Sequence, residues 1–187
     1  ILVIGNEILS GRTIDKNIYF LALWLNNNLG IKVSEVRIVP DVESKIVKNV
    51  LSLSKSNDYV LTTGGIGPTH DDITSKSISK AFKKKYIFHK EAYNILQKYY
   101  GNKNFNDPRK KMAKMPSGSK LIYNPSSAAP GFMIKNVICL PGVPSILKSM
   151  VDNLKNYMSP GLKTHSSTVS VETIESTIAK GLEKIQI

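Results

Sequence analysis

The segment from Tyr59 to Thr74, with the sequence YVLTTGGIGPTHDDIT, restricts the fold of this chain more than any other. It begins with a short apolar run that is typical of a strand buried in a parallel sheet. Gly64-Gly65-Ile66-Gly67 then predicts a sharp turn whose main chain comes close to a neighbour or a ligand. Apolar residues at helical spacing follow, at Ile73, Ile78, Ala81 and Phe82. The segment therefore predicts a strand, a glycine-rich turn and a helix, and main-chain N–H groups in such a turn bind phosphate or another anion.

Strand and helix patterns alternate on both sides of this segment. Before it, strands are expected over residues 1–4 and 33–39, and helices are expected from Asp15 to Gly30 and around residues 46–53. Such alternation predicts an α/β fold with a parallel sheet and right-handed crossovers.

After it, we expect a helix, a polar mobile loop and a second helix within residues 88–115, the loop covering 101–107 and Asp107 capping the second helix before Pro108. A hairpin is predicted about Lys135-Asn136, and a further helix is expected after Pro144.

Acidic residues follow three of the expected strands. Glu7 follows the first strand, Asp41 the second, and Asp71-Asp72 the third. Carboxylates beside an anion site repel the anion unless a cation lies between them, and a Mg²⁺-like ion held by carboxylates and phosphate oxygens removes that conflict. The alternative is that each acid caps a helix and lies in solvent.

The composition limits the classes of partner. The formal net charge is +12, but nearly all the positive charge is lysine and no nucleic-acid-binding module is visible, so we expect no nucleic-acid partner. No apolar run approaches the length of a membrane span and no signal peptide is seen, so we expect no membrane partner either. The single cysteine, Cys139, is expected to be buried, which fits a reducing, cytoplasmic location.

Several motifs together resemble one family. The glycine-rich segment is very similar to the signature of the molybdopterin-binding fold family, and Leu140-Pro141-Gly142-Val143-Pro144 is similar to its second signature. Asn124-Pro125 and Ala129-Pro130-Gly131-Phe132 resemble the branch formed by the N-terminal domain of the competence/damage-inducible (CinA) proteins. The resemblance implies a three-layer α/β sandwich with a mostly parallel sheet over residues 1–158.

The resemblance also implies a phosphorylated ligand. In the CinA and FAD-synthase branches it implies metal-dependent hydrolysis of nucleotide pyrophosphates such as ADP-ribose or FAD, with Mg²⁺, Mn²⁺ or Co²⁺ on Asp72, helped by Asp71 or Asp41. Glu7 or Asp41 would act as the base. The resemblance also implies an alternative, a protein that binds molybdopterin, or its adenylylated form, without turning it over. In the molybdenum-cofactor biosynthesis branch of the family, Asp41 and Asp72 belong to the pterin site.

The remaining expectations concern ligand contacts and organisation. The candidate ligand-binding residues are Thr63, Gly64, Gly65, Gly67, Thr69, Ser126, Pro141, Gly142 and Arg109. Residues 159–187 are expected to form a linker and a short βα extension, with a strand over 168–171 and a helix over 175–185. The family resemblance implies a homo-oligomer, either a dimer or a trimer. Because the chain begins inside an expected strand without Met, we also expect a few preceding residues.

Overall fold

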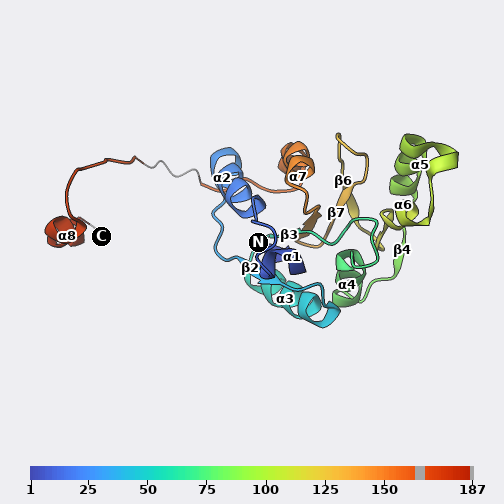
Figure 1. The fold of residues 1–187 in the computed structure, drawn as a ribbon, viewed down its shortest axis with the longest axis horizontal. Coiled ribbons are helices and arrows are strands. Elements are labelled where there is room, and N and C mark those ends of the chain that lie inside the picture. The colour runs from blue at the N-terminus through green and yellow to red at the C-terminus, as the bar shows by residue number, and fades with distance from the viewer. Residues whose placement is uncertain (163–166, 186–187) are drawn as a thin grey trace.

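A computed structural model describes residues 1–162 and 167–185 of the chain, which is built around a six-stranded sheet (Figure 1). The strand order is β2-β1-β3-β8-β7-β6. The strands are β1 (Leu2–Ile4), β2 (Arg37–Val39), β3 (Val60–Thr63), β6 (Lys120–Ile122), β7 (Gly131–Ile134) and β8 (Val137–Leu140). The pairs β2-β1, β1-β3 and β3-β8 are parallel, whereas β7 and β6 continue the sheet in antiparallel pairs. The predicted mostly parallel sheet is confirmed.

The central strands are buried on both faces, and this explains their apolar sequences. Every residue of β1, β3 and β8 is buried. Successive side chains point to opposite faces of a strand, so Val60 belongs to one hydrophobic cluster and Leu61 to the other. For this reason β1 and β8 are apolar throughout, whereas β3 ends in two buried threonines, Thr62 and Thr63.

Helices cover both faces of the sheet and complete the predicted three layers (Figure 1). On one face lie α3 (Glu43–Ser56) and α4 (Thr74–Ala81), and on the other lie α2 (Asn17–Leu29), α7 (Pro144–Met150) and the 3₁₀ helix η1 (Val151–Asn156). The predicted ends of α2 are confirmed. The carboxylate of Asp15 accepts a hydrogen bond from the N–H of Ile18 at 2.7 Å, and Gly30 is left-handed with φ 64°.

The hairpin between β7 and β8 turns where the sequence predicts it. Ile134 pairs with Val137, and Lys135 adopts a φ of 52° in the turn between them. The side-chain amide of Asn136 donates to the carbonyl oxygens of Ser54 and Asn57 at the end of α3. The turn is thereby tied to the neighbouring helix.

Residues 86–116 form a lobe beside the sheet, and its buried residues join the hydrophobic cluster that also contains α3 and α4. Here the prediction was partly wrong. The lobe contains α5 (Lys90–Asn104) and α6 (Asp107–Lys111) between the paired antiparallel strands β4 (Tyr86–Phe88) and β5 (Lys114–Pro116). The expected loop over 101–107 is mostly helical instead, because the chain kinks at Gly101 (φ 69°, ψ 157°) and then adds another helical turn. Asn106, not Asp107, caps α6, since its side-chain oxygen accepts from the N–H of Arg109 at 3.2 Å.

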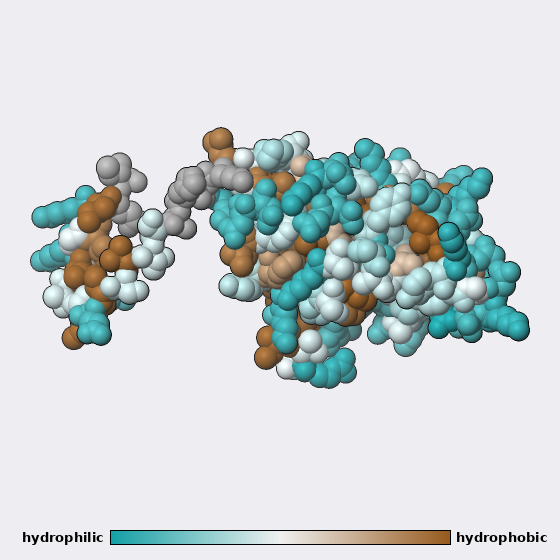
Figure 2. Space-filling view, turned by 90° about the horizontal axis from the view of Figure 1, so that it is seen from above, coloured by the Kyte–Doolittle hydropathy of each residue, from teal (hydrophilic) through white to brown (hydrophobic). Residues whose placement is uncertain are grey.

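The C-terminal part contains one helix, α8 (Glu175–Glu183), which lies apart from the main body in Figure 1. None of its residues is buried, and exposed hydrophobic side chains gather on this part of the chain in Figure 2. The expected helix is thus confirmed, although it ends two residues earlier than predicted. The expected strand over 168–171 is wrong, because Val169 and Val171 are exposed and no neighbouring strand pairs with their main chain. Part of the expected linker, residues 163–166, falls outside the described residues.

Candidate functional site

A cavity of about 770 Å³ opens at the carboxyl ends of β1, β3 and β8. This is the edge where parallel α/β sheets commonly bind ligands. Eight of the predicted site residues line it: Glu7, Gly64, Gly65, Gly67, Asp72, Arg109, Pro141 and Gly142. Side chains from β-strand ends and from the lobe therefore meet at one place.

The turn after β3 requires glycine for steric reasons. Gly64 and Gly65 have φ values of 97° and 69°, which side chains disfavour. A Cβ atom on Gly64 would lie 2.2 Å from the carbonyl oxygen of Ile4, and one on Gly65 would lie 2.1 Å from the hydroxyl of Thr74. Gly67 is restricted differently, because a Cβ there would lie 2.7 Å from Oδ2 of Asp72.

The same turn offers free hydrogen-bond donors to a ligand. Within residues 1–162 and 167–185, no protein acceptor pairs with the N–H groups of Gly65, Ile66 or Gly67. Ile66 and Gly67 are half-buried beside the cavity. Successive main-chain N–H groups in a turn form a concave site for an anion, so these unpaired donors beside a cavity are candidates to bind one.

The second glycine turn, after β8, packs directly against the first. A Cβ on Gly142 would lie 3.3 Å from the Cα of Gly64, and the N–H of Gly64 donates to the carbonyl of Leu140 at 3.1 Å. The side-chain amide of Asn17 donates to the carbonyl of Gly142 at 2.8 Å. The two motifs recognised in the sequence thus form one wall of the cavity.

Asp72 is oriented by Thr69, three residues earlier. Its Oδ2 accepts from the main-chain N–H of Thr69 at 2.8 Å and from the Thr69 hydroxyl at 2.5 Å. Lys111 of the lobe donates to the carbonyl of Thr69 and so holds this part of the turn. The proximity of the same hydroxyl is the main reason that the pKa of Asp71 is lowered. Oδ1 of Asp72 receives no hydrogen bond from the described protein groups.

Asp41 supports the site from the next strand end. Its Oδ2 accepts from the N–H of Asn6, the first residue of α1 (Asn6–Leu9), the short helix that carries Glu7. Burial raises the pKa of Asp41; the hydrogen bond from Asn6 opposes this, while the nearby carboxylates of Glu7, Asp71 and Asp72 add to it. The predicted acids are therefore electrostatic neighbours.

The acids do not form a ready-made metal cage. Among the described residues, no group of three or more His, Cys, Asp or Glu side chains is placed to hold a metal ion. The free Oδ1 of Asp72 and the crowding of carboxylates fit a Mg²⁺-like ion that takes one or two protein carboxylates and completes its shell with phosphate oxygens and water.

Several predicted residues lie near the cavity without lining it: Thr63, Thr69, Asp41, Asp71 and Ser126. Thr63 is buried in β3 and its hydroxyl lacks a hydrogen-bond partner among the described residues. The Ser126 hydroxyl donates to the side chain of Asn124 at 2.9 Å, and the neighbouring Ser127 lines the cavity in its place. The ligand roles given to these residues stay predictions.

The sequence analysis missed part of the lining. Tyr100 and Met112 reach the cavity from the lobe, and Asn124 reaches it from the loop before β7. Asn124 is 7% exposed and its amide donates to Ser127 Oγ and to the carbonyl of Ala129. A sequence signal existed for Asn124, which precedes Pro125 in one of the recognised motifs. None of the recognised motifs includes Tyr100.

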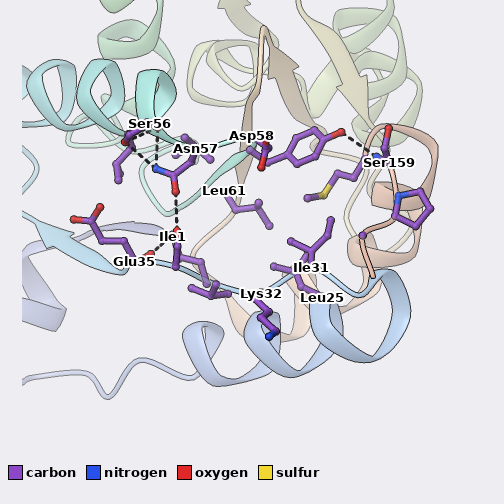
Figure 3. Close-up of a pocket in the computed structure, with 18 residues that line it drawn as sticks. Ile1, Leu25, Ile31, Lys32, Glu35, Ser56, Asn57, Asp58, Leu61 and Ser159 are labelled. Carbon is purple, nitrogen blue, oxygen red and sulfur yellow. Dashed lines mark hydrogen bonds between the residues drawn. The ribbon is translucent and has the colours of Figure 1, made fainter. Parts of the chain in front are cut away.

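A second cavity, of about 520 Å³, lies at the opposite ends of the strands (Figure 3). Its lining includes Ile1, Glu35 and Tyr59, and the main-chain nitrogen of Ile1 donates to the carbonyl of Glu35 at 2.7 Å. The Tyr59 hydroxyl accepts from the N–H of Ser159 at 2.9 Å. No predicted site residue lines this second cavity, so we place the functional site in the first.

Comparisons with known proteins agree with the motifs and the fold. Residues 1–162 match the model of the family described as "probable molybdopterin binding domain". A protein from Archaeoglobus fulgidus is 35% identical over 99% of this chain and 79% of its own length. A CinA-like protein from Fusobacterium nucleatum is 37% identical over 84% of this chain, but the match spans only 39% of that protein.

A solved structure gives the same result. The CinA protein of unknown function from Thermoplasma acidophilum superimposes with a TM-score of 0.78 at 32% identity, covering 83% of this chain and 94% of that one. None of the helices in the described residues is long and apolar enough to cross a membrane. The chain belongs to the molybdopterin-binding domain family, in the branch of the CinA proteins.

Proposed function

We propose that the cavity binds a nucleotide pyrophosphate, of the ADP-ribose or FAD type, and hydrolyses it with a divalent metal ion. One observation carries the proposal: unpaired N–H groups of Gly65, Ile66 and Gly67 lie on the same cavity as the carboxylates of Glu7 and Asp72. Donors without partners attract phosphate oxygens, and carboxylates beside bound phosphate require a cation. An anion site and a cation site therefore lie side by side.

Asp72 is the residue best placed to hold the metal ion, through Oδ1, because Thr69 fixes its other oxygen. The nearby carboxylates of Asp71 and Asp41 stabilise the positive charge of the metal ion. When bound, a divalent ion of this kind polarises a phosphoryl oxygen and lowers the pKa of an attacking water.

Protein groups that line the cavity stabilise the developing charge and accept the proton. The turn N–H groups stabilise the negative charge that develops on the phosphoryl oxygens, and their positions are fixed before the ligand arrives. Glu7, on α1, accepts the proton of the attacking water. Hydrolysis of the pyrophosphate bond then releases a nucleoside monophosphate and the second phosphorylated fragment.

The alternative function is binding of molybdopterin without turnover. The description of the matched family favours it, since that description names molybdopterin binding and says nothing of hydrolysis. The same turn would hold the pterin phosphate, and Asp41 and Asp72 would contact the pterin part. Only a turnover assay separates the two functions, because both use the same anion site.

A phosphorus NMR time course with ADP-ribose and with FAD, each with Mg²⁺, Mn²⁺ or Co²⁺, tests the proposal. We expect monophosphate signals with wild-type protein and none with Asp72→Asn, which keeps an acceptor for Thr69 but loses the charge. The matched control is Asp152→Asn, because Asp152 is exposed and pairs only with Lys155. Absence of turnover with every ion, together with tight pterin binding, would favour the alternative instead.

A further inference from the structure

Two lobe residues on the cavity form a stacked pair that the proposed function does not use. The guanidinium carbon of Arg109 lies 4.2 Å from the centre of the Tyr100 ring. Both side chains are half-buried and both line the cavity. Guanidinium groups and aromatic rings stack face to face, and the pair presents a flat, positively charged surface.

Arg109 is held in this position by its own lobe. Its side chain donates to the carbonyl of Asn104, and its main-chain N–H is capped by Asn106. None of the ion pairs in the described part of the chain includes Arg109, so no carboxylate neutralises it. The charge and the plane are both available to a ligand.

The surroundings of the pair suit a ring better than a phosphate. Met112 of the lobe lines the same cavity as the pair, and Ile66 of the glycine turn and Ile146 of α7 add further apolar lining. The free N–H groups belong to the glycine turn, which follows β3 of the sheet. Aromatic rings and guanidinium planes bind nucleobases by stacking, and apolar walls exclude water from the contact. The cavity therefore has an anion-binding part from the sheet and a ring-binding part from the lobe.

We propose that Tyr100 and Arg109 form a stacking platform for the planar base of a nucleotide whose phosphates lie in the glycine turn. This assignment rests on the proposed function and deepens it, because it names the residues that would hold the base. Inorganic pyrophosphate would occupy the turn alone, and ADP would occupy both parts. The lobe, rather than the sheet, then determines which pyrophosphates the protein prefers.

Calorimetric titration with ADP and with inorganic pyrophosphate, both with Mg²⁺, separates the two parts. We expect Tyr100→Leu and Arg109→Lys to weaken ADP binding on the order of tenfold to a hundredfold, the usual contribution of one stacked base, while pyrophosphate binding is unchanged. Arg109→Lys keeps the charge and loses only the plane. Tyr100→Phe keeps the ring and should bind ADP as the wild type does.

The control is Tyr19→Leu, the same substitution at a tyrosine that is 75% exposed on α2. Equal weakening of ADP and pyrophosphate in Arg109→Lys would overturn the inference, because Arg109 would then act on phosphate. Unchanged ADP binding in both variants would overturn it as well. If the wild type binds pyrophosphate but not ADP, the proposal of a stacking platform is wrong and the proposed anion site is kept. If it binds neither ligand, the proposed function is wrong as well.

Discussion

Replacing Gly64 by alanine tests whether the contact between the glycine turn and β1 holds the site together. The substitution has two separate costs. A side chain at φ 97° costs about 1–2 kcal/mol from the left-handed backbone alone. The new Cβ would also lie 2.2 Å from the carbonyl oxygen of Ile4 in buried β1, and relieving such overpacking costs roughly 1–3 kcal/mol. The free energy of unfolding should therefore fall by about 2–5 kcal/mol.

The matched control is Gly118→Ala. Gly118 has a similar φ of 82°, but a Cβ there meets no atom within 4 Å, so only the backbone cost applies. For a domain of this size, each kcal/mol lowers the melting temperature by roughly 2–4 °C. We expect a drop of about 4–20 °C for Gly64→Ala and about 2–8 °C for Gly118→Ala in thermal denaturation followed by circular dichroism. Equal drops would refute the reasoning, because the approach to Ile4 would then cost nothing.

Three further substitutions or treatments test other parts of the structure. Gly67→Ala should melt near the wild-type temperature yet lose roughly 100-fold in turnover, because the new Cβ displaces the Asp72 carboxylate, 2.7 Å away; equal turnover in steady-state kinetics would contradict this. The pKa of Asp41 is raised above 3.8 in the folded state, so over this pH range the folded state holds a proton on Asp41 that the unfolded state has lost. The free energy of unfolding should therefore fall as pH rises from about 3.8 through the raised pKa. In urea titrations, Asp41→Asn should make this fall smaller. Burial raises the pKa of Cys139 to about 12, so at pH 8 the thiol should react with an aromatic disulfide reagent only after denaturation; rapid reaction in native protein would contradict its burial.

The sheet and its two glycine turns were predictable because local chemistry determines them. A strand buried on both faces favours apolar residues, as in β8 and in Val60-Leu61 of β3, although β3 ends in the buried threonines Thr62 and Thr63. A left-handed residue packed closely against its neighbours must be glycine, as at Gly64 against the main chain of Ile4 and at Gly65 against the side chain of Thr74. These requirements leave a direct record in the sequence, and the resemblance to the family rests on the same positions.

The lobe was harder to predict because its structure depends on distant contacts. Tyr86–Phe88 and Lys114–Pro116 become strands only because they pair with one another across two intervening helices, and each is three residues long. Tyr100 belongs to a segment that was predicted to be helical, but a predicted helix does not show which of its residues line a cavity. Likewise, nothing in the sequence separates Ser126 from Ser127. Asn124 bonds both hydroxyls, and only the folded loop shows that Ser127 lines the cavity.

The pairing of β4 with β5 brings the two ends of the lobe together, with Tyr86 opposite Pro116. A segment whose ends are adjacent can be lengthened, shortened or replaced without moving the strands to which it is attached. Residues 86–116 can therefore be exchanged as one segment without moving the strands of the sheet. Any replacement must still supply the apolar contacts of Leu96 and Met115 with the shared core and the hydrogen bond from Lys111 to the carbonyl of Thr69.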